Sequence, residues 1–392
     1  MIDYHLLVKN TTPFILTYFA PSKYVRFFCL IVFLAVAAPV FSQKGLSIES
    51  IFHYGKVVKH RDILGFEVTE PSFGTEIGFR FQTFGTQSWH YWQNYPLLGG
   101  SLLYYYFGNH ATLGSAVAAY PSLHFYLFRR TRFDVQCQVG TGIAYLTKPF
   151  NAVTNPNNNA IGSTFTNITA LRMGARWTFA TRWAAQAGGS LTHFSNGASQ
   201  LPNLGLNITA LYIGLQYSPS PLQKPDYQVP TESSTPPHRF GLMLHADLAF
   251  VEDKIPGGPK YPIYIASLGG VYHLSKVNRL ILGAEYEWNS SIYAFNQHIS
   301  PAGNEAASRR LAVRTMVFLA DEWLFGNWSI LLQAGTYFGA NRRDNFFIYN
   351  KLNVRYYLPA FGTPKTRFFM GVYLKSHRAI AEYIALGGGA TF

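Results

Sequence analysis

From residue 43 onward the sequence is a series of short segments in which apolar residues, many of them aromatic, alternate with polar ones. Each segment has about 9–13 residues, and no apolar run approaches the ~18–20 residues that cross a bilayer as a helix. Charged residues make up 13% of the chain, against roughly 25% in soluble domains. This combination is typical of a transmembrane β-barrel, and we predict an all-β, antiparallel barrel of the outer membrane.

Clusters of Gly, Pro, Asn and Ser separate the alternating segments and predict about eight strands in each half of the chain. In the first half the predicted strands lie near 45–55, 73–83, 98–107, 112–129, 132–146, 161–178, 181–195 and 206–218. In the second half they lie near 239–251, 263–274, 278–290, 308–320, 326–337, 346–358, 366–377 and 382–392. Two architectures fit this count, a single barrel of about 14–16 strands or two small barrels in tandem. We favour the single barrel.

The N-terminus has the pattern of a secretory signal peptide. Lys23 and Arg26 precede an apolar run over 27–38, and a cleavage site follows Ser42. An inner-membrane anchor is the alternative interpretation. A Pro- and Ser-rich stretch after the eighth predicted strand cannot form a strand ladder and is predicted to be a periplasmic linker. The expected organisation is a signal peptide (1–42), a first barrel half (43–218), the linker (219–238) and a second half (239–392) that ends on an aromatic residue.

Charge and cysteine content limit the partners. The formal net charge is +13, and a basic surface favours a polyanion. For an exported barrel, phosphorylated lipopolysaccharide fits better than nucleic acid, which we exclude; alternatively, Lys and Arg merely flank strands at the membrane interfaces. Only Cys137 remains after the signal peptide, so no intramolecular disulfide is expected. The histidines lack metal-ligand spacing, and we expect no metal or cofactor.

One strand end combines residues that suit nucleophilic catalysis. His193 and Ser195 are two apart in a predicted strand, so their side chains lie on the same face about 6.5–7 Å apart. A serine hydroxyl is a weak nucleophile until a neighbouring base takes its proton. Asn207 lies on the apolar face of the next predicted strand, at the end of that strand nearest to Ser195. If the apolar faces contact lipid, these three residues lie on the outside of the barrel at its extracellular rim, where a membrane lipid is within reach.

The motifs around this pair resemble those of the PagL-type lipid A deacylases, also described as acyloxyacyl hydrolase-like outer-membrane proteins. The resemblance rests on H-F-S-N-G and L-P-N-L-G-L-N, with G-T-G-I-A-Y-L-T-K-P-F and N-N-N-A-I-G-S upstream. It extends over roughly 45–217 and is densest from Val139 onward. It implies an eight-stranded outer-membrane barrel that hydrolyses the ester-linked acyl chain at the 3-position of lipid A. The family's motifs do not cover the second half.

The resemblance also implies roles for individual residues. Ser195 would be the nucleophile and His193 the general base. Asn196, Asn203 and the backbone amide of Gly197 would form the oxyanion hole, where donors stabilise the charge of the tetrahedral intermediate. The alternative interpretation of Asn196, Gly197 and Asn203 is turn chemistry alone.

Asn207 departs from the family pattern, in which a Glu orients the histidine. An Asn can hold a histidine tautomer, but it does not offset the charge of the imidazolium. A carboxylate from Glu67, Glu70 or Glu76 is the alternative, provided that the barrel closes with the eighth strand beside the first two. We therefore predict an outer-membrane esterase acting on lipid A, with outer-membrane lipids and lipopolysaccharide as partners and a homodimer as a further possibility. The alternative function is a non-catalytic structural or transport barrel that keeps the hydrolase-like loop.

Overall fold

The computed structural model describes residues 43–59, 62–236, 238–253, 255–299, 305–338, 347–359, 366–378 and 380–392. The expected signal peptide lies outside these residues. The first half contains eight strands: β1 (Leu46–Val58), β2 (Ser72–Gln82), β3 (Leu97–Tyr106), β4 (Ser115–Arg129), β5 (Phe133–Leu146), β6 (Phe165–Ala180), β7 (Trp183–Ser195) and β8 (Leu206–Tyr217). A short helix, α2 (Ser88–Trp92), lies in the β2 to β3 connection, and a 3-10 turn, η1 (Lys224–Asp226), lies in the linker.

The second half repeats this number of strands: β9 (Phe240–Glu252), β10 (Lys260–Ser275), β11 (Asn278–Asn289), β12 (Val313–Phe325), β13 (Trp328–Phe338), β14 (Ile348–Tyr357), β15 (Arg367–His377) and β16 (Ile380–Thr391). Two helices, α3 (Ser290–Ile299) and α4 (Glu305–Ala312), interrupt the chain between β11 and β12. Among the residues that the structure describes, no helix is long and apolar enough to cross a membrane.

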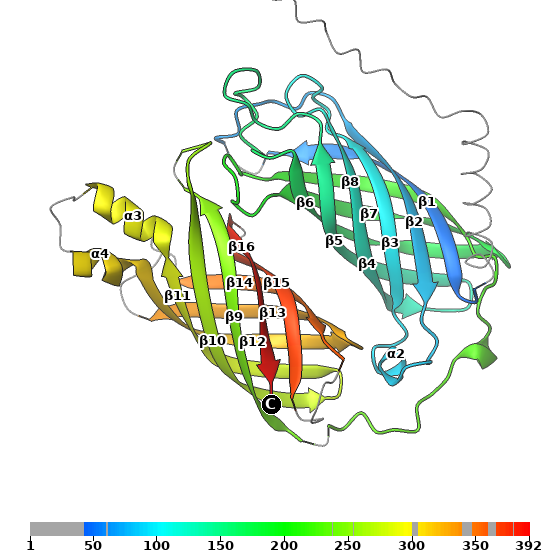
Figure 1. Ribbon diagram of the computed structural model, residues 1–392. Coiled ribbons are helices and arrows are strands. Elements are labelled where there is room, and N and C mark those ends of the chain that lie inside the picture. The colour runs from blue at the N-terminus through cyan, green and yellow to red at the C-terminus, as the bar shows by residue number, and fades with distance from the viewer. Residues whose placement is uncertain are drawn as a thin grey trace, which may run out of the picture. The chain divides into compact units, whose positions relative to one another are not determined.

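Each half closes on itself (Figure 1). All neighbouring strands are antiparallel, and β1 pairs with β8 through register partners such as Val58 with Asn207. In the second half, β16 pairs with β9, for example at Gly389 and His245. The chain therefore forms two closed barrels of eight strands, whereas the sequence favoured a single larger barrel. The linker contributes no strand, so the edges of β1 and β8 find their hydrogen-bond partners in each other.

The strands are apolar outside and polar inside. On β8 the outward side chains of Leu211, Ile213 and Leu215 are exposed by 74, 64 and 52%. On β2 the inward positions include Glu76 and Arg80, which are buried, while Ile77 and Phe79 between them are exposed. This is the inverse of a soluble sandwich and is the arrangement of barrels whose outer wall contacts lipid.

Ion pairs fill the middle of the first barrel. Arg172 donates to Glu49 Oε1 at 2.7 Å and to Glu76 Oε2 at 3.3 Å. The same Glu76 oxygen lies 3.0 Å from His53 Nε2, and Arg80 pairs with Glu49. Each charge is buried, and pairing offsets the cost of removing it from water.

Toward the end where β7 terminates, the interior of the first barrel becomes apolar. The rings of Phe107 and Phe194 pack edge to face at 5.3 Å between centroids. Leu146, Ile161 and Leu206 belong to the same buried cluster. We call this buried cluster the apolar plug; the loops at that end of the barrel pack on it.

The interior of the second barrel is charged. Lys351 pairs with Glu285 at 2.6 Å, and Lys375 pairs with Glu287 at 2.6 Å. All four side chains are almost completely buried. An eight-stranded barrel is just wide enough for its side chains to fill, and here they are matched cations and anions.

Candidate functional site

Strand β7 delivers His193 and Ser195 to the end of the first barrel that carries the long loops. Its outward face bears Leu191 and Gly189, and Gly189 is the register partner of Leu211 on β8. Phe194 points inward and is fully buried in the apolar plug. His193 and Ser195 therefore share the outward face, as the sequence predicted. The loop 196–205 then connects β7 to β8.

His193 is oriented by the residue opposite it. His193 and Asn207 are register partners across β7 and β8, and the Nδ1 atom of the ring lies 2.6 Å from Asn207 Oδ1. An amide oxygen only accepts, so the ring nitrogen facing it carries the proton. This tautomer leaves the basic lone pair on Nε2, as a general base requires.

Ser195 is held by two donors. Asn203 Nδ2 donates to Ser195 Oγ at 3.0 Å, and the backbone N–H of Gly197 donates to the same oxygen at 3.2 Å. Asn203 Oδ1 accepts the backbone N–H of Asn196 at 3.0 Å, which fixes the orientation of the Asn203 side chain. Ser195 itself is buried, with 8% of its surface exposed.

The side chain of Asn196 has other partners. Its Nδ2 donates to Ser163 Oγ at 3.0 Å and to the carbonyl of Gln200 at 2.8 Å. The amide thus ties the start of the loop 196–205 to its middle and to the neighbouring loop. Of the three residues predicted for the oxyanion hole, Gly197 and Asn203 place donors at the serine oxygen, and Asn196 contributes through the fold of the loop.

The neighbouring loop 147–164 packs against the site and was not recognised as part of it. The buried Asn158 donates to the carbonyl of Lys148 at 2.6 Å. Two backbone amides of the site loop, at Leu204 and Gly205, donate to the carbonyls of Asn159 and Ala160 at 3.4 and 2.9 Å. The run N-N-N-A-I-G-S therefore holds the loop that presents Asn203. The sequence marked this run only as part of the family resemblance, without assigning its residues a role.

Gly205 is a second residue that the sequence did not single out. Its φ is +80°, and a Cβ atom there would lie 2.9 Å from Cε1 of the His193 ring. The absence of a side chain lets the backbone pass close beside the imidazole. The nearby L-P-N-L-G-L-N motif contained this glycine, but only the folded loop reveals what it contacts.

Two of the three alternative carboxylates, those of Glu70 and Glu76, are engaged elsewhere. The barrel does close with β8 beside β1, but Glu76 points into the interior, where it meets His53 and Arg172. Glu70 accepts a hydrogen bond of 2.6 Å from the hydroxyl of Tyr106. The contact to His193 Nδ1 comes from Asn207.

In the second half, His377 ends β15 and Glu382 lies near the start of β16, on either side of the turn that joins these strands. Both are buried inside the barrel, and His377 Nε2 lies 2.6 Å from the hydroxyl of Tyr337. His377 Nδ1 lies 3.6 Å from Glu382 Oε2. They belong to the charged interior. Among the described residues, no group of three or more His, Cys, Asp or Glu side chains is placed to hold a metal ion.

Two family models match the chain. The model described as lipid A 3-O-deacylase (PagL) matches residues 74–216, and the model described as acyloxyacyl hydrolase, C-terminal domain, matches residues 238–392. The chain belongs to the PagL family. It is an outer-membrane β-barrel protein, and its family supports a function of the deacylase type. No curated protein matches the chain.

Solved barrels resemble this PagL-family protein at low identity. The outer-membrane enzyme PagL is 14% identical with a TM-score of 0.30, and the match covers 45% of this chain and 99% of PagL. Neisserial surface protein A is 8% identical with a TM-score of 0.31, covering 44% of this chain and 97% of that protein. The KdgM porin is 8% identical with a TM-score of 0.17, covering 70% and 92%.

Proposed function

We propose that this protein is an esterase that removes an ester-linked acyl chain from lipid A in the outer leaflet. The observation that carries the proposal is the pair of bonded groups at one end of β7. His193 is oriented by Asn207, and Ser195 is held by Asn203 and Gly197. All lie at the end of an outward apolar face, where a lipid ester in the membrane meets the barrel wall.

We assign Ser195 as the nucleophile and His193 as the general base of this reaction. Ser195 Oγ attacks the ester carbonyl carbon while His193 Nε2 takes the hydroxyl proton. The tetrahedral intermediate collapses when His193 returns that proton to the sugar oxygen and the ester C–O bond breaks. A water molecule, deprotonated by the same histidine, then attacks the carbonyl carbon of the acyl-enzyme. The bond from that carbon to Ser195 Oγ breaks as His193 returns the proton to Oγ, and the fatty acid is released.

The oxyanion is stabilised by donors that already converge on the serine. The Gly197 N–H and the Asn203 Nδ2 group lie 3.2 and 3.0 Å from Ser195 Oγ, so an oxygen developing beside that atom comes within their reach. Loss of one such donor typically costs roughly 3–4 kcal/mol of transition-state stabilisation. Asn207 holds the histidine without a counter-charge, which lowers the rate rather than changing the reaction.

The rival function, a transport barrel, required a wide lumen. Eight strands enclose an interior that side chains can fill, and ion pairs occupy both interiors here. This observation favours the esterase. A transport barrel would conduct ions in planar bilayers and leave lipid A unchanged.

Mass spectrometry of lipid A from expressing cells tests the proposal. We expect the wild type to remove one acyl chain and the Ser195→Ala variant to remove none. Ser199→Ala is the matched control, because Ser199 lies in the same loop and should leave the reaction intact. Unchanged lipid A in cells with correctly inserted wild type would refute the activity. Equal activity of wild type and Ser195→Ala would refute the assigned nucleophile.

A further inference from the structure

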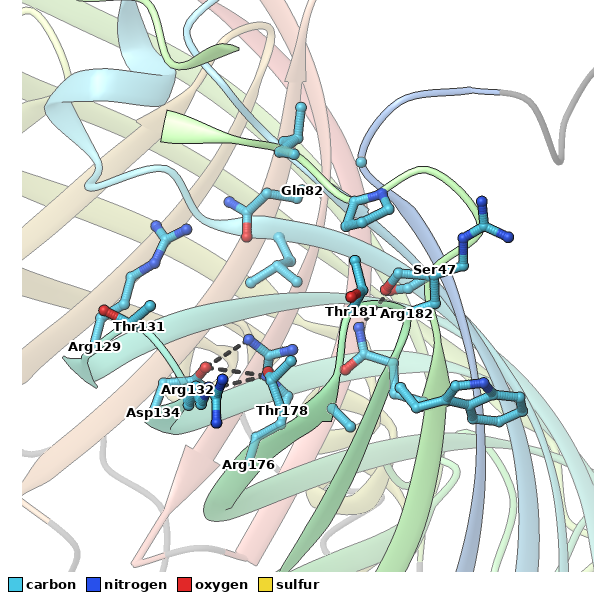
Figure 2. Close-up of a pocket in the computed structure, with 18 of the residues that line it drawn as sticks. Ser47, Gln82, Arg129, Thr131, Arg132, Asp134, Arg176, Thr178, Thr181 and Arg182 are labelled. Carbon is cyan, nitrogen blue, oxygen red and sulfur yellow. Dashed lines mark hydrogen bonds and ion pairs between the residues drawn. The ribbon is translucent and has the colours of Figure 1, made fainter. Parts of the chain in front are cut away.

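A cavity of about 740 Å³ opens at the end of the first barrel opposite Ser195. Figure 2 shows Arg129, Arg132, Arg176 and Arg182 among the side chains around it. Arg129 ends β4, and Arg130 and Arg132 come from the β4 to β5 connection. Arg176 comes from β6 and Arg182 from the β6 to β7 turn. Asp134 is the one carboxylate among the residues that line this arginine pocket.

The five arginines differ in whether another side chain of the protein pairs with them. Arg176 forms an ion pair with Asp134 at 2.6 Å, visible as dashed lines in Figure 2. Arg129 lies over the Tyr126 ring and bonds to the hydroxyl of Tyr227. Within the described part of the chain, no carboxylate lies within ion-pair distance of Arg132 or Arg182, and both are exposed. The pocket therefore holds an excess of positive charge that its own residues do not neutralise.

A buried acceptor lies in the same pocket. Gln216 is 5% exposed and lines the pocket, and its Nε2 donates to Ser47 Oγ at 2.7 Å. Its Oε1 has no hydrogen-bond partner among the described residues. A buried amide oxygen is usually paired. A ligand that joins an anion to a hydroxyl group would satisfy the arginines and this oxygen together.

The linker forms one wall of the pocket through Pro221, Leu222, Gln223 and Tyr227. Asp226 fixes that wall. Its carboxylate accepts the backbone N–H of Gln223 at 2.8 Å and pairs with Lys44 at 2.8 Å, and these contacts lower the pKa of Asp226. These contacts fix the conformation of the linker segment that forms the wall.

The pocket lies at the periplasmic face if Ser195 lies at the outer one. The turns at the arginine end are short between β4 and β5 and between β6 and β7, which is the periplasmic pattern. Strand β7 has 13 residues, and a rise of ~3.3 Å per residue separates the two ends by about 40 Å. Phospholipid headgroups of the periplasmic leaflet are at this level.

We propose that the arginine pocket binds the phosphate group of an anionic phospholipid with a hydroxylated headgroup, such as phosphatidylglycerol. Arg132 and Arg182 contact the phosphate, because guanidinium groups bind phosphate oxygens through paired N–H donors. Gln216 Oε1 accepts a headgroup hydroxyl. This site is independent of the ester chemistry at Ser195.

Native mass spectrometry of the purified full chain in a neutral detergent tests this site. Short-chain phosphatidylglycerol is titrated against phosphatidylcholine, which has the same phosphate but a choline in place of glycerol. Inorganic phosphate is added in a separate arm. We expect phosphatidylglycerol to bind in preference to phosphatidylcholine, and the Arg132→Gln, Arg182→Gln double variant to bind it at least about tenfold more weakly.

The matched control is Arg239→Gln with Lys276→Gln, which removes the same charge from the second barrel, outside the pocket. It should bind phosphatidylglycerol as the wild type does. Both double variants should keep the heat-modifiable migration of a folded barrel. Equal weakening in both variants, or none in the pocket variant, would overturn the site. Binding of inorganic phosphate without phosphatidylglycerol would overturn the lipid as the ligand.

Discussion

At the scale of single residues, the proposed mechanism makes Asn207 the residue that decides how well His193 works as a base. The amide oxygen fixes the proton on Nδ1 at 2.6 Å, but it leaves the imidazolium of the transition state without a counter-charge. In serine proteases, replacing the corresponding aspartate by asparagine lowers kcat by about 10⁴ because the histidine takes the wrong tautomer; the bond from His193 Nδ1 to Asn207 Oδ1 avoids that part of the loss here. The geometry here already exists, so only the charge is missing.

We therefore predict that Asn207→Glu raises the deacylation rate by about tenfold or more. The longer carboxylate can reach Nδ1 from the same register position and stabilises the charged ring. The measurement is the rate of fatty acid release from lipid A by purified protein in detergent. Adding Ser195→Ala to the same chain should abolish the gain. An unchanged or lower rate in a folded variant would show that the neutral partner is not what limits this enzyme.

Much of this site could be predicted from residue spacing. His193 and Ser195 share a face because they are two apart in a strand, and that requires no knowledge of the fold. The contact between Asn203 and Ser195 spans a loop, and nothing in the order of loop residues shows which amide turns back toward the serine. Asn196 illustrates the limit, since its side chain bonds to Ser163 and Gln200.

At the scale of elements, the strands were predictable and their closure was not. A period of two residues marks each strand, so β7 and β8 start and end within about two residues of their predicted bounds. The same alternation serves a barrel of eight strands or of sixteen. Which strand the edge of β1 meets depends on pairing between residues such as Val58 and Asn207, far apart in the sequence.

The loop that enters β8 gives a prediction with a close control. Gly205→Ala places a methyl group 2.9 Å from the His193 ring at a φ of +80°. Gly257 has a φ of +79° and open space around the same position, so Gly257→Ala carries the same backbone strain, roughly 1–2 kcal/mol, without the contact.

We expect Gly205→Ala to lower kcat for deacylation by about tenfold, because a displaced catalytic group costs rate steeply. Gly257→Ala should keep the wild-type kcat. Both variants should show a similar small loss of stability, measured as the temperature at which heat-modifiable migration is lost. Equal activity of the two variants would mean that the position of the His193 ring does not depend on Gly205.

At the scale of the whole molecule, each half has its own closed sheet and its own filled interior. The hydrogen bonds of β1 and β8 are complete without any strand of the second half. The apolar plug and the ion pairs of the first barrel are likewise built from its own residues. The catalytic candidates all lie in this half.

It follows that a chain ending shortly after β8 should fold and act alone. We predict that residues 1–230, which keep the linker segment that pairs with Lys44 and Phe84, insert into the outer membrane and deacylate lipid A. Heat-modifiable migration reports folding, and mass spectrometry of lipid A reports activity, with Ser195→Ala in the shortened chain as the control. A folded but inactive shortened chain would assign the second barrel a part in the reaction. Failure to fold would show that closure of β1 on β8 is not sufficient for stability.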